Sequence, residues 1–574
     1  MELNHYELSV RYADGAVTIA AGGMERSYPA SEQRAVKCDN HSLSYPYLAA
    51  ATDRGEVWAL DGIGLYETGE ASLTFPLGTR HLKVRTVDFI DRTDYHDALV
   101  LEQTRAIYHR VSEVFHASLY IVTDLLSRVS LVILGDAPYY TPTQLEIKNE
   151  TAVFTGAGWG AFYGMCREGE ESALVRSYYR AVYRGVPRFS MSNTWGDRSG
   201  GNMLCTEFIR RELDCAADLG VDIMQIDDGW QQGVTYDPAN RIVENGLTFR
   251  RFTDDFWKLN AAKFPDGLQP LAAHALEKGV RMGIWFGPCT YNGGDRLPED
   301  AAVIRHFYDD WDVRYVKLDM VSLSATGGHT REECTANYLA FLDTISKIGT
   351  DRPRTDDPRS FPLQFNLDIT ASDRLGYFAG KQYGTLFVEN RYSDYHSYYP
   401  HNTLKNLWQL SRWIPADKFQ FELLNPRRNP DQYKDDPLGP ANYDLDYLFA
   451  AVMTANPLVW MEMQNLDQKD ADALRRIISV WKTVRRDFDR SVVDPIGGCP
   501  DGRAFTGFHI TGGEKEYLLL FRELDEEARH TLPLQTADGD WTLVASNTEA
   551  SCTAKGGQIE AAIGKPLGYA LFAR

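Results

Sequence analysis

Short apolar runs that end in polar residues alternate with helix-like stretches between about residues 183 and 490. A strand that is buried on both faces reads as a nearly continuous apolar run, and a helix separates consecutive parallel strands. Eight strand–helix units in roughly 300 residues predict an α/β protein with a central (β/α)8 TIM barrel. The predicted strands are Phe189–Asp197, Asp222–Asp227, Val280–Pro288, Val313–Val321, Pro362–Thr370, Gly384–Asp394, Lys418–Pro426 and Leu458–Gln464.

The run Val313–Val321 shows how such a barrel would be built. Side chains alternate along a strand, so Lys317 and Asp319 share one face. Val316 and Leu318 share the other face, which would pack against the surrounding helices. Asp319 lies at the C-terminal end of the run, where such barrels carry their chemistry. From this stretch alone, an Asp that caps the next helix is an equally good interpretation.

Helix signals lie between the predicted strands. Phe208–Leu219 and Leu271–Lys278 have apolar residues at helical spacing, and Gly279 suits the C-cap of the second helix. The last predicted helix has an apolar face that runs from Leu474 to Phe488. These segments complete the strand–helix order that a barrel requires.

The regions on either side of the predicted barrel are β-rich. Short strand-like runs fill the first part of the chain, and Asp14-Gly15 between two of them is typical of a hairpin turn. Asp494-Pro495-Ile496-Gly497-Gly498 follows the last helix and predicts a domain boundary. We therefore predict an N-terminal β-sandwich over residues 1–182, the barrel over 183–490 and a small C-terminal β-domain over 491–574. Nothing in the N-terminal region predicts chemistry.

Composition and charge narrow the class of protein. The net charge is −20 and no basic run occurs, which argues against nucleic acid and anionic membranes as partners. Aromatic residues make up 12% of the chain, which favours carbohydrate because aromatic faces pack on the C–H patches of sugars. A large β-rich core explains the same excess equally well.

The cysteines and the N-terminus indicate in which cellular compartment the protein is expected. The eight cysteines are scattered without a Cys-x-x-Cys pair, so they predict free thiols rather than a disulfide framework or a zinc site. The N-terminus lacks a signal-peptide pattern, and no apolar stretch reaches the ~20 residues of a membrane span. We expect a cytoplasmic protein, although a chain with its signal peptide removed would look the same.

Polar and aromatic residues gather at the ends of five predicted strands, which would meet at one mouth of the barrel. Carboxylates and cations bind sugar hydroxyls through charge-assisted hydrogen bonds, and Trp rings supply a flat wall. The sequence therefore favours a sugar site. The candidate residues at this mouth are Trp195, Asp227, Asp228, Trp285, Lys317, Asp319, Arg391 and Asp394.

Cleavage of a glycoside needs two carboxylates with different roles. Asp319 and Asp394 follow strands that are two apart in the barrel, so they can face each other across the mouth. Lys317 would keep Asp319 ionised, and attraction from Arg391 would add to this. Asp394 would have to carry a proton, which a negative Asp319 roughly 5 Å away would favour. Each Asp alone fits a cap or a surface ion pair better, whereas the set at one mouth favours a site.

Five motifs resemble, in order, those of the α-galactosidases of glycoside hydrolase family 36 and of the clan that it shares with family 27. The resemblance covers about residues 185 to 490. The motifs are Asn193-Thr194-Trp195, Asp227-Asp228-Gly229-Trp230, Gly283-Ile284-Trp285-Phe286, Lys317-Leu318-Asp319 and Arg391-Tyr392-Ser393-Asp394.

The resemblance implies a retaining, exo-acting hydrolase of terminal α-galactosides. Asp319 would be the nucleophile that forms a covalent glycosyl-enzyme, and Asp394 would be the acid/base. An oligosaccharide or glycoside would be the substrate, with no metal or cofactor. Family relatives are often oligomers, so a homo-oligomer is expected by resemblance only, since no interface signal is visible in the sequence.

The same resemblance implies a set of sugar-binding residues, and a paired carboxylate would read the axial O4 of galactose. The implied contacts are Asp227 and Asp228 with O4 and O6, Lys317 with O3 or O4, Arg391 as an orienting group, and Trp195 and Trp285 as walls of the subsite.

Three departures from the family pattern suggest a divergent branch. Where the family commonly has a Cys- and Gly-rich motif that contacts O2, this chain has Phe365-Asn366-Leu367-Asp368-Ile369-Thr370. Alternation turns Asn366 and Asp368 inward, so we expect them to take that role. The N-terminal domain is short for the family. After Asp394 the sequence Tyr395-His396 replaces the usual Asp or Asn, and the leaving-group subsite would be shaped by Tyr392, Tyr395, Tyr398 and Tyr399.

Alternatives to an α-galactosidase stay open from the sequence. A related enzyme could take another sugar with an axial O4, either a β-L-arabinopyranoside or an α-N-acetylgalactosaminide. A transglycosylase similar to raffinose synthases would transfer the galactosyl unit instead. The rival from another class is a non-catalytic carbohydrate-binding protein on a degenerate barrel, and the presence of both carboxylates, the Lys and the Arg argues against it.

Overall fold

The structure is a computed structural model. From residue 77 onward it describes the chain except for residues 78–80, 108–111, 136–142, 149, 157–160, 184, 198–199, 253–254, 352–360 and 372. Before residue 77 it describes only the backbone of eight strands.

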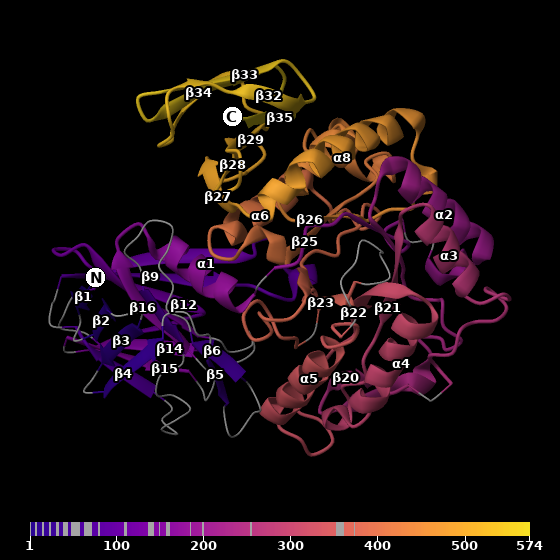
Figure 1. The fold of residues 1–574 in the computed structure, drawn as a ribbon, viewed down its shortest axis with the longest axis horizontal. Helices are drawn as coiled ribbons and strands as arrows, with labels where there is room; N and C mark the ends of the chain where they lie inside the picture. The colour runs from indigo at the N-terminus through magenta and orange to yellow at the C-terminus, as the bar shows by residue number, and fades with distance from the viewer. Residues whose placement is uncertain are drawn as a thin grey trace.

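Eight parallel strands close into a barrel in chain order, so the predicted fold class is confirmed (Figure 1). All eight lie at the predicted positions, although the last begins at Asn456 rather than Leu458. The barrel strands are β17 (Met191–Asn193), β18 (Ile223–Ile226), β21 (Arg281–Phe286), β22 (Val313–Leu318), β23 (Gln364–Asp368), β24 (Thr385–Phe387), β25 (Phe419–Leu423) and β26 (Asn456–Val459).

Helices cover the outside of the barrel, and the apolar face predicted for the last of them is buried. Gly279 follows the second helix with a φ of +75°, a left-handed backbone conformation that suits glycine. An antiparallel ribbon of β19 (Arg241–Glu244) and β20 (Leu247–Arg250), which the sequence did not predict, follows β18. The barrel helices are α2 (Thr206–Leu219), α3 (Gln269–Glu277), α4 (Leu297–Asp310), α5 (Arg331–Ile345), α6 (Pro400–Ser411), α7 (Leu445–Val452) and α8 (Gln468–Phe488). None of the described helices is long and apolar enough to cross a membrane.

Antiparallel sheets precede the barrel. A six-stranded sheet has the order β10-β9-β12-β13-β16-β7, and a four-stranded sheet has the order β11-β14-β15-β8. The predicted hairpin exists, because Ala13 pairs with Ala16, while Asp14-Gly15 lies outside the described residues. Helix α1 (Glu171–Val182) then leads to the barrel. The strands are β1 (Glu2–His5), β2 (Leu8–Ala13), β3 (Ala16–Ala21), β4 (Met24–Pro29), β5 (Arg34–Lys37), β6 (Ser44–Tyr47), β7 (Trp58–Asp61), β8 (Ser72–Pro76), β9 (Leu82–Phe89), β10 (Val100–Ile107), β11 (Glu113–Ala117), β12 (Leu119–Asp124), β13 (Val129–Gly135), β14 (Thr143–Lys148), β15 (Thr151–Thr155) and β16 (Ala161–Arg167).

Two antiparallel sheets follow the barrel and lie over α6 and α8 (Figure 1, yellow). The stretch around Pro495, at which the sequence predicts a domain boundary, forms strand β27 (Val492–Gly497). Proline is tolerated there because β27 is the edge strand of the sheet β27-β28-β29-β35-β32. The other strands are β28 (Phe505–Thr511), β29 (Tyr517–Arg522), β30 (Arg529–Pro533), β31 (Gly539–Asp540), β32 (Thr542–Ser546), β33 (Ala550–Lys555), β34 (Gln558–Ile563) and β35 (Gly568–Ala573).

The segment after β9 joins the N-terminal sheets to the barrel. The amide of Arg92 donates to the carbonyl of Ile369 (2.8 Å), and the amide of Asp94 donates to the carbonyl of Thr370 (3.0 Å). Ile369 and Thr370 directly follow β23, so this segment lies at the C-terminal end of the barrel strands. The sequence of the N-terminal region did not predict this placement beside the barrel mouth.

Candidate active site

Asp319 follows β22 directly, and its carboxylate accepts three hydrogen bonds. The indole Nε1 of Trp285 donates to Oδ2 (3.0 Å), and Nη2 of Arg374 donates to Oδ1 (3.1 Å). The amide of Met320 also donates to Oδ1, at 2.5 Å. The side chain keeps 22% of its surface exposed, so the carboxylate remains accessible while its orientation is fixed.

The surroundings of Asp319 stabilise its ionised form. Burial by itself would raise the pKa of this carboxyl group. Arg374, Lys317 and the indole N–H of Trp285 outweigh burial and lower the pKa below its ordinary value. A carboxylate held ionised and accessible at the end of a barrel strand has the properties of a nucleophile.

Lys317 points into the barrel from β22. Its Nζ lies 3.3 Å from Oδ2 of Asp227, and it sits 4.7 Å from the ring centre of Phe387 and 4.8 Å from that of Trp460. Burial lowers the pKa of Lys317, but the carboxylates of Asp227, Asp319 and Asp368 outweigh it and raise the pKa. The lysine therefore stays an ammonium ion among three acids.

Asp227 and Asp228 form a hydrogen-bonded pair at the end of β18. Oδ2 of Asp227 accepts a hydrogen bond from Nδ2 of Asn193 (2.7 Å), and Oδ1 accepts one from the amide of Asp228 (2.8 Å). Oδ1 of Asp228 accepts hydrogen bonds from Gln231 and Thr235, each at 2.6 Å. Burial raises the pKa of Asp228, and the negative charges of Asp227 and Asp319 add to the rise.

Arg374 is the main residue that sequence reasoning missed. It lies in the loop after β23, is 5% exposed, and forms ion pairs with both Asp319 and Asp368. Its Nη1 also donates to the carbonyl of Asp368 at 3.1 Å. A single Arg in a loop has no periodic pattern, so its only signal is its position in a βα loop at the active end of a predicted barrel.

Asp368 and Asn366 on β23 are placed differently from the expectation that they contact a sugar. Oδ1 of Asp368 accepts hydrogen bonds from the amide and the hydroxyl of Thr370, at 2.8 and 2.7 Å, besides its ion pair with Arg374. Asn366 is fully buried and donates to Gln420 at 2.7 Å. Both side chains are buried, so direct sugar contact does not fit this geometry.

Trp285 and Trp195 differ in how much of each ring is exposed. Trp285 is 1% exposed, so it offers a sugar almost no surface and instead orients Asp319. This corrects the expectation that Trp285 forms a wall. Trp195 is only partly buried, and its indole interacts with the hydroxyl of Tyr392. Trp195 keeps a surface that a ligand can contact.

Arg391 and Asp394 follow β24. The guanidinium of Arg391 donates to the carbonyl of His96 (2.6 Å), and its amide donates to Glu422 (2.6 Å). The arginine beside Asp319 is thus Arg374 rather than Arg391, contrary to expectation. Asp394 is partly exposed in a turn and lies near Tyr433, whose pKa its charge helps to raise.

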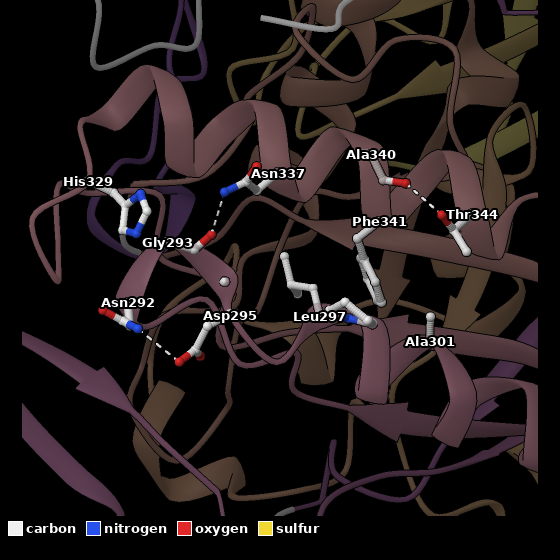
Figure 2. A pocket seen from close by; sticks show the side chains of 12 residues that line it. Asn292, Gly293, Asp295, Leu297, Ala301, His329, Asn337, Ala340, Phe341 and Thr344 are labelled. Atoms are coloured by element: carbon white, nitrogen blue, oxygen red, sulfur yellow. Dashed lines mark hydrogen bonds between the residues drawn. The ribbon is translucent and has the colours of Figure 1, made fainter.

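A groove lies between α4 and α5 (Figure 2). This groove has a volume of about 560 Å³, an apolar floor that includes Leu297 and Phe341, and polar groups at its edge such as His329 and Asp295. None of the predicted site residues lines it. Among the residues that the structure describes, no group of three or more His, Cys, Asp or Glu side chains could hold a metal ion.

The fold and the mouth define a class of protein, a (β/α)8 barrel with β-rich flanking domains and a mouth built from carboxylates and cations. Solved structures that align with nearly the whole chain include α-galactosidases of family GH36. The chain aligns with GH36 α-galactosidase AgaA from Geobacillus stearothermophilus over 99% of its length and 81% of that protein, with a TM-score of 0.61 and 13% identity. It aligns with the α-galactosidase from Lactobacillus brevis over its whole length and 98% of that protein, with a TM-score of 0.62 and 9% identity.

Sequence comparison gives weaker matches to the same kind of protein. The α-galactosidase of Escherichia coli is 26% identical over 184 residues, which are 31% of this chain and 22% of that protein. Alpha-galactosidase 2 of Pediococcus pentosaceus is 28% identical over 127 residues, which are 22% of this chain and 15% of that protein. The chain thus matches less than a quarter of the length of each of these relatives. No protein-family model matches the chain.

Proposed function

We propose that the protein is a retaining, exo-acting α-galactosidase that hydrolyses terminal α-galactosides by double displacement. The observation that carries this proposal is the ionised carboxylate of Asp319, held by Arg374, Trp285 and Met320 at the C-terminal end of β22. The likeness to α-galactosidases supports the same activity, and solved complexes of AgaA variants contain raffinose or stachyose.

In the first step, the carboxylate of Asp319 attacks the anomeric carbon while the bond to the leaving oxygen breaks. Asp394 donates its proton to that oxygen. In the second step, Asp394 takes a proton from water, which attacks the anomeric carbon and releases Asp319. Two inversions at one carbon give net retention, so galactose leaves in the α configuration.

The charges at the mouth suit both steps. Arg374 and Lys317 keep Asp319 ionised before attack, and they stabilise it again as the leaving group of the second step. The pair Asp227 and Asp228 would accept hydrogen bonds from O4 and O6, and Trp195 would pack against the sugar. Arg391 would not contact the sugar directly. Its guanidinium donates to the carbonyl of His96 and so holds the chain segment after β9 against the barrel mouth.

The proposal is tested with a chromogenic α-galactoside, the wild type and Asp319→Ala. We expect the wild type to be active and the variant to lose about 10⁴-fold or more in kcat. Asp266→Ala, a change at an exposed position on the barrel, is the matched control and should keep full activity. An inactive wild type, or an active Asp319→Ala, would refute the proposal.

The same assay separates the sugars that share an axial O4. We expect the α-galactoside to be cleaved faster than a β-L-arabinopyranoside, which lacks the C6 group that Asp228 would bind. If the arabinopyranoside or an α-N-acetylgalactosaminide were cleaved faster, that sugar and not galactose would be the preferred substrate.

A further inference from the structure

The segment Ile90–His96 of the N-terminal region is fixed onto the barrel from both of its ends. The carbonyl of Ile90 accepts a hydrogen bond from the hydroxyl of Tyr377 (2.9 Å), and the carbonyl of His96 accepts one from Arg391 (2.6 Å). The hydroxyl of Thr93 donates to the carbonyl of Val388, just after β24. The segment therefore lies across the ends of β23 and β24, between the loops that carry Arg374 and Arg391.

Asp94 is the acid that this segment brings to the mouth. Its charged neighbours are Arg374, Arg391 and the proposed nucleophile Asp319. Oδ2 of Asp94 meets Nδ2 of Asn390 at 3.4 Å, which is long for a hydrogen bond. Oδ1 is buried and has no hydrogen-bond partner among the described residues.

The unpaired, buried Oδ1 of Asp94 requires an explanation. A buried polar atom without a partner is costly, and carboxylate oxygens in folded proteins are nearly always paired. Burial raises the pKa of Asp94 to about 6, so near neutral pH the group is still largely ionised. The neighbouring arginines favour that charge. Because the Asp94 side chain as a whole is only partly buried, its ionised carboxylate, close to the nucleophile, is suited to accept a hydrogen bond from a hydroxyl group of a ligand.

The strand order indicates which hydroxyl this is. With the anomeric carbon at Asp319 and O4 and O6 at the acids that follow β18, the opposite side of the sugar ring faces β23 and β24. The hydroxyl on that side, next to the anomeric carbon, is O2. The β23 residues expected to contact O2 are less accessible than Asp94, since Asp368 is paired with Arg374 and Asn366 is fully buried, whereas Asp94 is only partly buried.

We propose that Asp94 is a specificity-determining residue that accepts a hydrogen bond from O2 of the bound galactosyl unit. The inference rests on the proposed function for the orientation of the sugar. An acetamido group in place of O2 would crowd Asp94, so the site should prefer α-galactosides to α-N-acetylgalactosaminides. The carboxylate that reads C2 then comes from the N-terminal region rather than from the barrel.

The test compares two substrates, 4-nitrophenyl α-galactoside and its 2-deoxy analogue, with wild type and Asp94→Asn. We expect the variant to lose about 10- to 100-fold in kcat/KM on the galactoside, the range of a hydrogen bond to a charged group. On the 2-deoxy analogue it should lose less than about threefold, because the interaction is already absent. Asp97→Asn, the same change at an exposed position of the same connection, should leave both substrates unaffected.

Equal losses on both substrates would overturn the inference, because Asp94 would then act through the structure alone. Calorimetric binding of galactose and 2-deoxygalactose separates this failure from failure of the proposed function. If the wild type binds galactose more tightly than 2-deoxygalactose and Asp94→Asn does not, the inference stands even without hydrolysis. If Asp94→Asn keeps that preference, or if the wild type binds the two sugars equally, the inference is wrong.

Discussion

The barrel buries Lys317 near one end and Lys418 near the other, and these two lysines have opposite electrostatic surroundings. Lys317, near the C-terminal end of β22, lies among Asp227, Asp319 and Asp368, which raise its pKa although burial opposes them. Lys418 immediately precedes β25 at the other end and donates to the carbonyls of Tyr383 (2.5 Å) and Gly384 (2.9 Å). Burial lowers the pKa of Lys418 well below its ordinary value.

The comparison shows what separates a functional charge from a structural donor in one scaffold. Both side chains are almost completely buried, so burial alone does not distinguish them. The difference lies in the hydrogen-bond partners. The carboxylates around Lys317 stabilise its positive charge, whereas the backbone carbonyls around Lys418 mainly accept hydrogen bonds from its N–H groups. Charge is thus concentrated at the mouth, where Asp319 has to be ionised.

Replacing each lysine by methionine gives the largest expected contrast. Lys317→Met removes a cation beside the nucleophile, so kcat should fall by about 10²- to 10³-fold, as for loss of one preorganised electrostatic donor. Lys418→Met should lower the free energy of unfolding by roughly 1–3 kcal/mol through lost hydrogen bonds. The kcat of its folded fraction should stay within about threefold. Chromogenic assays and thermal melts measure both, and equal loss of kcat in the two variants would contradict the comparison.

Arg374→Lys tests whether catalysis needs the planar guanidinium group beside Asp319 or only a positive charge there. A lysine keeps the charge but does not span Asp319 and Asp368 together as the guanidinium does. We expect kcat to fall by about 30- to 100-fold with little change in KM. The matched control is Arg211→Lys, which alters an exposed ion pair with Glu207. Full activity of Arg374→Lys would show that geometry at Asp319 is unimportant.

Trp285→Phe removes the indole N–H that donates to Asp319, together with part of a buried ring. Loss of one hydrogen bond to a charged group should lower kcat by about 10- to 30-fold. Trp481→Phe deletes a buried indole hydrogen bond to the carbonyl of Met453, away from the mouth, and should affect thermal stability but not kcat. If the two variants have the same kcat, the bond to Asp319 does not contribute to the reaction.

The pH profile separates Asp319 from Asp94. Asp319 stays ionised through the mildly acidic range because its pKa is lowered, whereas the pKa of Asp94 is raised to about 6. In the wild type, kcat/KM should therefore fall about fivefold from pH 6 to pH 5, and Asp94→Asn should lack this fall. An unchanged acid limb in Asp94→Asn would assign it to another group.

The same raised pKa has a consequence for stability. The folded state holds the proton of Asp94 more tightly than the unfolded chain does, so this contribution is present at low pH and is lost as pH rises from about 4 through 6. Asp94→Asn should accordingly show a smaller decrease in melting temperature over this interval than the wild type.

The barrel strands could be predicted because each is a local apolar run that ends in polar residues. Asp319, Lys317 and Asp227 lie at these ends, and strand alternation alone turns Lys317 inward. Arg374 and Asp94 could not be predicted, because each reaches the mouth from a segment without a periodic pattern. Asp94 comes from a connection between antiparallel strands, and only tertiary contacts with Ile369 and Thr370 place it there.

The misplaced residues have a related cause. Alternation turns Asn366 inward but does not tell how deep it lies, and in the structure it is fully buried beside Gln420. Trp285 was expected to present its ring, yet its neighbours in the core leave only the N–H available at the mouth. The local sequence thus determines to which face of a strand a side chain points. How deeply that side chain is buried depends on the packing of the whole barrel.

The role of Asp319 is tested most directly by chemical rescue of Asp319→Gly with azide. If Asp319 is the nucleophile, azide should enter the space of the missing carboxylate, attack the same face of an activated α-galactoside and restore turnover. The product should then be β-galactosyl azide. Formation of α-galactosyl azide, or no rescue of an otherwise folded variant, would contradict the assignment of the nucleophile.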